Sequence, residues 1–409
     1  MKKELLKSIA YYEKVRLVIA IIITALMTAV FFGMAIHPDG LYVSDTPLHI
    51  DAGILLDGYG LETIFIFFLG LLTSFPLLQL IFAVAESFLV MLTWLISLKL
   101  IERYFTLTKW IALFISTGLI FVTALYIPVI YPYFYAFSLG SQPWHNSTYF
   151  GMRLFAVVYL YFFYGTYPTY LDGIKTKSWW TMALSLAVAT MFKPNFLLTV
   201  CISLATVLLA GLLKHRNMVC LKSTFIMGLT VVLSMIVLAV QYILIYKSGG
   251  GSEESGIAIV FFSNLLWEGS IGHMLLKFAR SFFFPLYVWI ADLIVSKRDN
   301  RPVDPNLGYS LWLFFVSVVI YSVFKETGSR EYHGNFGWGI PAGLYIVFIY
   351  AVPYFFQNML QYTYKRNESK SASKDVYYLI GIFVLFWHLI SGIVYFVNVA
   401  QGVEIPWSI

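Results

Sequence analysis

Long apolar stretches dominate this sequence and limit what it can fold into. A helix needs about 18 or more mostly apolar residues to cross the hydrocarbon core of a bilayer. Such stretches lie near residues 17–36, 77–98, 110–130, 150–170, 179–193, 195–213, 223–246, 281–296, 308–324, 338–356 and 376–398. The fifth is short, and Lys193-Pro194 separates it from the sixth, so these two predict a tight helical hairpin. We therefore predict an all-α, polytopic membrane protein of about eleven spans.

The composition supports one membrane domain over residues 1–409. Hydrophobic residues make up 60% and charged residues only 12%, whereas soluble domains are about one quarter charged. The net charge of +6 is explained by basic cytoplasmic loops and does not require a nucleic-acid partner. Two cysteines form neither a disulfide framework nor a metal quartet. No zinc-type spacing, Walker loop or dinucleotide motif occurs, so we expect no metal and no cofactor.

The distribution of basic residues orients the spans. The short apolar stretch 61–75 can either lie flat in the membrane interface or cross the membrane. If it lies flat, 20 of the 27 Lys and Arg are on the cytoplasmic side, and the other seven are Arg153, Lys193, Lys247, Lys277, Arg280, Lys325 and Arg330. Counting 61–75 as a span would invert every later loop, against the excess of Lys and Arg in cytoplasmic loops. The sequence thus predicts an N-in, C-out protein with an interfacial helix in its first external loop.

This topology places the polar loops on the extracytoplasmic side, at about 37–76, 131–149, 247–280 and 325–337. The candidate catalytic residues are Asp45, His49 and Asp51, because an ionised Asp can accept a proton from an attacking hydroxyl. The candidate donor-phosphate ligands are the cations Lys193, Lys277, Arg280 and Arg330. The candidate substrate-binding residues are Trp144, His145, Asn146, Asn195, Glu331, His333 and Asn335.

Each candidate also has a simpler interpretation. Asp45 and Asp51 can be solvated loop residues, and Lys193 can extend to the interface without binding a ligand. Trp144 can anchor the chain at the membrane surface instead of stacking on a sugar. The concentration of all these groups on one side favours a shared site.

The pattern resembles the GT-C class of integral membrane glycosyltransferases, which take sugars from polyprenyl-phosphate carriers. The features that carry it are an acidic first external loop (Asp45 and Asp51), an interfacial helix, Lys193-Pro194 at the outer end of short helices, and a long loop at about 247–280. The resemblance covers the architecture up to about residue 300. Two features depart from the class: the first loop lacks an adjacent acidic pair, and we find no soluble acceptor domain after the last span. The 326–335 region also matches no class motif, and this region suggests a subfamily that builds bacterial surface polysaccharides.

The resemblance implies an inverting hexosyl- or pentosyltransferase in the plasma membrane. Asp45 would be the catalytic base, and Lys193 and Arg280 would contact the phosphate of the donor. The partners would be the polyprenyl-phosphate lipid, a saccharide or envelope acceptor, and the bilayer.

Two alternatives remain open. A flippase or transporter of a lipid-linked saccharide needs a polar path through the bilayer, for which Glu86 and the break at Lys193-Pro194 are candidates. A polysaccharide polymerase or ligase would use the same carrier and the same face, with Arg330 and His333 as suitable residues.

Overall fold

The computed structural model describes residues 2–36, 46–55, 61–129, 143–144, 148–246, 256–262, 271–298, 300–328, 335–365 and 372–402. The elements are α1 (Lys2–Ile36), α2 (Thr46–Ile54), α3 (Leu61–Gly70), α4 (Phe75–Tyr104), α5 (Lys109–Leu119), α6 (Thr148–Thr166), η1 (Tyr167–Asp172), α7 (Thr176–Phe192), α8 (Asn195–His215), α9 (Met218–Gly228), η2 (Leu229–Val231), α10 (Val232–Tyr246), β1 (Gly256–Ile259), α12 (Ile271–Arg298), α13 (Pro305–Val323), β2 (Phe324–Thr327), η4 (Asn335–Trp338), α14 (Gly339–Lys365) and α15 (Ala372–Ala400).

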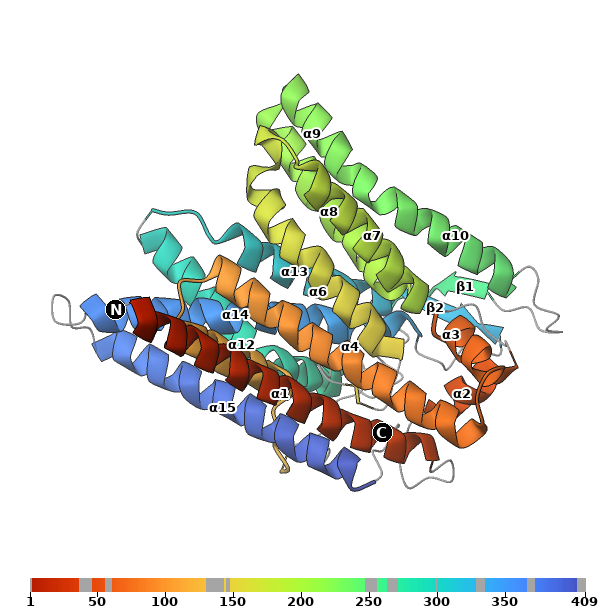
Figure 1. The fold of residues 1–409 in the computed structure, drawn as a ribbon. Helices are drawn as coiled ribbons and strands as arrows, with labels where there is room; N and C mark the ends of the chain where they lie inside the picture. Colours follow the sequence, from red (N-terminus) through yellow and green to blue (C-terminus); the bar gives the residue numbers. More distant parts are fainter. Residues whose placement is uncertain are drawn as a thin grey trace.

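Long apolar helices form most of the structure (Figure 1). In the described part of the chain, eight are long and apolar enough to cross a membrane: Ser8–Ile36, Phe75–Tyr104, Asn195–His215, Met218–Ile243, Leu275–Arg298, Pro305–Val323, Phe336–Tyr364 and Lys374–Ala400. Helix α6 packs against α4 and α7 within the same bundle. The prediction of an all-α polytopic membrane protein is confirmed at this level.

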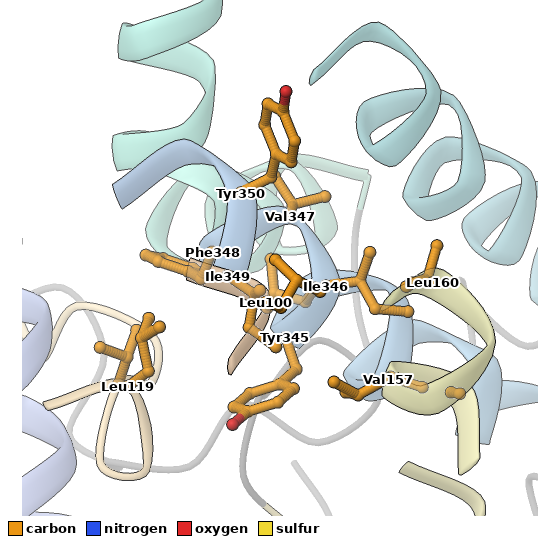
Figure 2. Close-up of a cluster of buried hydrophobic side chains, with 14 of the residues drawn as sticks. Leu100, Leu119, Val157, Leu160, Tyr345, Ile346, Val347, Phe348, Ile349 and Tyr350 are labelled. Atoms are coloured by element: carbon orange, nitrogen blue, oxygen red, sulfur yellow. The ribbon is translucent and has the colours of Figure 1, made fainter. Parts of the chain in front are cut away.

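Helix α14 lies at the centre of the bundle. In its most apolar window 94% of the residues are buried, compared with 22% for Met218–Ile243, which lies at the periphery. Figure 2 shows residues 345–350 of α14 surrounded by Leu100 of α4, Leu119 of α5, and Val157 and Leu160 of α6. A helix that is apolar on all sides is expected in such a central position.

The bundle has two distinct ends. The chain begins at one, here called the N-terminal end, and α1 finishes at the opposite end, where α2, α3, β1, β2 and the tip of the α7–α8 hairpin lie (Figure 1); we call this the α3 end. At the N-terminal end Tyr12 donates a hydrogen bond to Glu102 at 2.6 Å, and the Lys109 ammonium lies 5.3 Å from the Tyr12 ring centroid. The helix ends that flank the basic α4–α5, η1–α7, α8–α9, α12–α13 and α14–α15 junctions lie on this side too (Figure 1).

The apolar stretch 110–130 does not form one helix. Helix α5 ends at Leu119, and residues 122–126 are non-helical although they are apolar and largely buried. Non-helical backbone inside a membrane protein must find partners for its N–H and C=O groups. Helix α15 supplies several of them. Thr123 O lies 2.6 Å from His388 Nδ1, Tyr126 N–H donates to Ser391 Oγ at 3.0 Å, and Trp387 Nε1–H donates to Tyr126 O at 3.0 Å.

A two-stranded antiparallel sheet lies at the α3 end. Strand β1 pairs with β2 in a register that places Gly256 opposite Thr327 and Ile259 opposite Phe324. The sequence predicted no strand there. Because β2 directly follows α13, the sheet ties the segment after α10 to the end of α13.

Candidate functional site

The tip of the α7–α8 hairpin carries the first predicted cation. Helix α7 ends at Phe192, and Lys193 has an extended backbone with φ −147° and ψ 127°. Pro194 follows and α8 begins at Asn195, so the predicted break between two helices is confirmed. The Lys193 ammonium lies 4.7 Å from the centroid of the Trp338 ring, within range of a cation–π interaction. This contact joins the hairpin tip to the start of α14.

Close packing of α8 against α14 fixes the position of this tip. A Cβ atom at Gly339 would lie 3.0 Å from Thr199 Oγ1 and 3.5 Å from the Asn195 carbonyl oxygen. The glycine therefore lets the two helices approach directly beside Trp338. Asn195, a predicted substrate-binding residue, is buried beneath this contact with 6% exposure.

Helix α12 carries two further predicted cations, Lys277 and Arg280, and both are buried. Arg280 Nε–H donates to the Leu125 carbonyl at 2.6 Å, and Leu125 N–H donates to the Arg280 carbonyl at 3.1 Å. Arg280 thus supplies partners for both backbone polar groups of Leu125 in the non-helical segment 122–126. Lys277 lies one turn earlier on α12, which places the two side chains on neighbouring parts of its surface.

Arg153 is a buried cation that was not among the predicted site residues. It lies in the first turns of α6 with 2% exposure. Its guanidinium carbon is 5.4 Å from the Tyr149 ring centroid, 4.9 Å from that of Phe150 and 4.8 Å from that of Tyr345. The sequence signal was a lone Arg in an apolar helix with aromatic residues three and four positions before it.

The predicted catalytic loop is described only in part. His49 and Asp51 lie on α2, where His49 is half-buried and Asp51 is exposed. Helix α2 packs closely on α3, because a Cβ at Gly53 would come within 2.4 Å of Ile66 Cγ2. Asp45 precedes α2 and lies outside the described residues.

Several other predicted residues also lie outside the described part of the chain: His145, Asn146, Arg330, Glu331 and His333, together with the side chain of Asn335. Trp144 is described and is 1% exposed. Its ring centroid is 5.5 Å from that of Phe150 and 5.3 Å from that of Phe396, so Trp144 packs between α6 and α15 in the interior.

The burial of cationic side chains distinguishes the two halves of the bundle. Among the described Lys and Arg residues, only Arg153, Lys277 and Arg280 are buried, at 2%, 3% and 2% exposure. All three lie in the half nearer the α3 end, on the first turns of α6 and α12. A buried carboxylate, Glu326 at 7% exposure, lies on β2 at the same end. Cations removed from water interact strongly with a phosphate, so these residues are candidates for contact with an anionic group.

Comparisons with models of protein families, with characterised proteins and with solved structures found no match to this chain. The fold and the burial of charge define its class: a polytopic helical membrane protein with buried cations toward one end of the bundle.

Proposed function

We propose that this protein is a GT-C-like membrane glycosyltransferase. It would transfer a sugar from a polyprenyl-phosphate carrier to a cell-envelope acceptor on the extracytoplasmic side of the plasma membrane. The observation that carries the proposal concerns the described Lys and Arg residues: those that are buried lie in the half of the bundle nearer the α3 end. A lipid-linked sugar brings its phosphate to the edge of a bilayer, where such cations can stabilise the departing phosphate.

The proposed topology has eleven spans and is N-in, C-out. The spans are α1, α4, α5 with its non-helical continuation, α6, α7, α8, the continuous α9–α10 segment, α12, α13, α14 and α15. The α3 end then faces away from the cytoplasm, and α3 lies in the interface before α4. The gathering of the basic junctions at the N-terminal end supports this orientation (Figure 1).

The proposed chemistry is a direct displacement at the anomeric carbon. The acceptor oxygen forms a bond to this carbon while the bond from the carbon to the phosphate oxygen breaks, and the phosphate leaves with the electron pair. Asp45 accepts the proton of the acceptor hydroxyl. Lys193, Arg280 and Arg330 stabilise the charge that develops on the leaving phosphate. Lys193 is held for this role by the ring of Trp338.

The proposal is tested by mass spectrometry of lipid-linked sugars and envelope glycans. Strains lacking the chain are complemented with the unmodified protein, with Asp45→Asn, with Lys193→Met, or with Lys214→Met. Lys214 is the control, because it is an exposed Lys at the end of α8, on the N-terminal side. Loss of one leaving-group contact is expected to lower the rate by about 10²- to 10³-fold.

We expect Asp45→Asn and Lys193→Met to remove one sugar from the envelope while its polyprenyl-phosphate donor accumulates on the outer leaflet. Lys214→Met should restore the glycan. Full restoration by Asp45→Asn and Lys193→Met, at normal amounts of inserted protein, would refute the proposed site.

A second candidate function is a flippase for a lipid-linked saccharide. The interruption of α5 after Leu119 favours it, since broken helices are common at the binding sites of transporters. The described part of this break is, however, braced by side chains of α12 and α15, which leaves less of its backbone for a substrate. The same strains separate the two functions, because a failed flippase leaves the lipid-linked saccharide facing the cytoplasm.

A further inference from the structure

Strand β1 and the residues that follow it expose an apolar surface at the α3 end. Ile257 and Ile259 are 51% and 64% exposed, and Phe261 and Phe262 are 68% and 56% exposed. In a strand, residues two apart lie on the same face, so Ile257 and Ile259 form one apolar face of β1. Ala258 points to the opposite face and is half-buried. The sequence had placed this segment in a long flexible external loop.

The backbone after β1 holds the two phenylalanines at this surface. Phe262 has a left-handed backbone with φ 62°, which is unusual for a bulky residue. Its N–H donates to the Ser322 carbonyl at 2.6 Å, and the Val260 N–H donates to the Val323 carbonyl at 2.9 Å. The turn is therefore attached to the end of α13. A strained conformation that the surrounding structure maintains often has a functional reason.

The position of β1 limits which environment its apolar face can meet. The sheet has two strands, β1 and β2, in the part of the chain that the structure describes, so β1 is an edge strand. An open sheet edge is not tolerated in the hydrocarbon core, because its N–H and C=O groups would lack water. An apolar face beside an edge that needs water fits the boundary between hydrocarbon and headgroups.

The apolar surface of α10 leads toward this boundary. Val240, Tyr242 and Ile243 near the end of α10 are 50%, 48% and 50% exposed, as expected of a span that faces lipid. Figure 1 shows β1 at the same end of the bundle as this end of α10. Both elements therefore expose apolar side chains at the α3 end.

We propose that residues 256–262 form a lip that inserts into the outer surface of the bilayer, with Ile257, Ile259, Phe261 and Phe262 in contact with lipid. The partner is bilayer lipid at the depth where acyl chains meet the headgroups. Apolar side chains such as Phe are buried at this depth in segments that bind the membrane surface. The lip lies on the same end of the bundle as the tip of the α7–α8 hairpin (Figure 1), where Lys193 contacts Trp338. It would therefore hold that end of the protein at the level of lipid phosphates.

Spin-label accessibility tests the lip directly. Both native cysteines are replaced (Cys201→Ser and Cys220→Ser), and single cysteines are introduced as Ile257→Cys, Ile259→Cys and Phe261→Cys. His215→Cys is the water-exposed control at the end of α8, and Ile236→Cys, at a site with 56% exposure on α10, is the lipid-exposed control. The labelled proteins are placed in vesicles of phosphatidylethanolamine and phosphatidylglycerol, and collision rates are measured with oxygen and with a water-soluble nickel chelate.

We expect oxygen to collide with the labels at 257, 259 and 261 several times more often than the nickel chelate does, as at 236. A nickel accessibility equal to that at 215 would overturn the proposal. Exclusion of both reagents would also overturn it, since that result means that protein, either a second copy or another segment, covers the strand. Labels at three exposed positions provide independent reporters if one variant folds poorly. No step of sugar transfer enters the readout, so its outcome is independent of the proposed enzyme activity.

Discussion

Replacing Gly392 by alanine tests how α15 supports the interrupted helix. A Cβ atom at Gly392 would lie 1.4 Å from the Phe121 carbonyl oxygen and 2.6 Å from the Phe121 carbonyl carbon. Both are backbone atoms, so no side-chain rotation can relieve the overlap. Ordinary van der Waals contact begins at 3.4 Å. If α15 and the segment after α5 move directly apart, they must therefore separate by 2.0 Å, the difference between 3.4 Å and 1.4 Å.

A separation of this size breaks the hydrogen bonds between α15 and residues 123–126. The donor–acceptor distances of these bonds are 2.6 Å between His388 Nδ1 and Thr123 O, 3.0 Å between Tyr126 N and Ser391 Oγ, and 3.0 Å between Trp387 Nε1 and Tyr126 O. Hydrogen bonds weaken steeply beyond about 3.5 Å. Each contributes about 1 kcal/mol net, and more where a buried partner is left unsatisfied, so the expected loss is about 3 kcal/mol or more.

The assay is unfolding of the purified protein by sodium dodecyl sulfate in mixed micelles, followed by circular dichroism. The control is Gly308→Ala in α13, because nothing lies within 4 Å of a Cβ at Gly308. Removal of a helical glycine there should stabilise the protein by about 0.5–1 kcal/mol. If Gly392→Ala unfolds at the same detergent fraction as Gly308→Ala, the inferred contact between α15 and the segment after α5 is wrong.

Three further substitutions probe other parts of the molecule. Trp338→Ala should raise the KM for the polyprenyl-phosphate donor by about 2- to 30-fold in vesicle transfer assays. The reason is the loss of a cation–π contact of Lys193 worth about 0.5–2 kcal/mol. Trp338→Phe keeps an aromatic ring and should retain most of the affinity for the donor. Arg301→Ala should lower the free energy of unfolding by about 1–3 kcal/mol without changing transfer per folded molecule, because it removes the 2.6 Å ion pair of the 1%-exposed Asp292 side chain. The 38% exposure of Arg301 and the remaining hydrogen bond from Tyr354 keep this cost below that of a fully buried pair. Gly53→Val should cost about 1–3 kcal/mol and reduce transfer, because the new side chain meets Ile66 and pushes α2 away from α3; an unchanged thermal midpoint would contradict the close packing.

The sequence predicted the long helices well because hydropathy is a local property. The stretch 195–213 corresponds to α8, and the interruption at Pro194 was predicted from the missing backbone N–H of proline. The short stretch 61–75 contains α3, which is a short helix as expected; its predicted position in the interface remains a prediction.

The interruption after Leu119 could not be predicted from local composition. Residues 120–126 are as apolar as the spans and contain no proline or glycine; Gly118 and Pro128 flank them but do not mark the break at Leu119. Their partners His388 and Ser391 are each 265 positions away in sequence from the groups that they contact. The strand pairing of Ile257 with Glu326 is likewise a contact between distant segments. Such elements depend on tertiary structure, which periodicity along the chain does not report.

The sequence was enough to choose the candidate cations but not to predict how buried they are or what they contact. Lys193, Lys277 and Arg280 were selected as cations at the membrane face that can bind a phosphate, and Lys193 also because a cation at the end of a span is costly without a partner. The burial of Lys277 and Arg280 and the cation–π contact of Lys193 could be seen only in the fold. The fold also shows that Arg280 braces Leu125 through its Nε–H. A variant that removes Arg280 therefore changes both a proposed phosphate ligand and the support of the interrupted helix. Lys193 contacts an aromatic ring at the tip of a hairpin, so its removal disturbs less structure and reports more directly on the proposed phosphate.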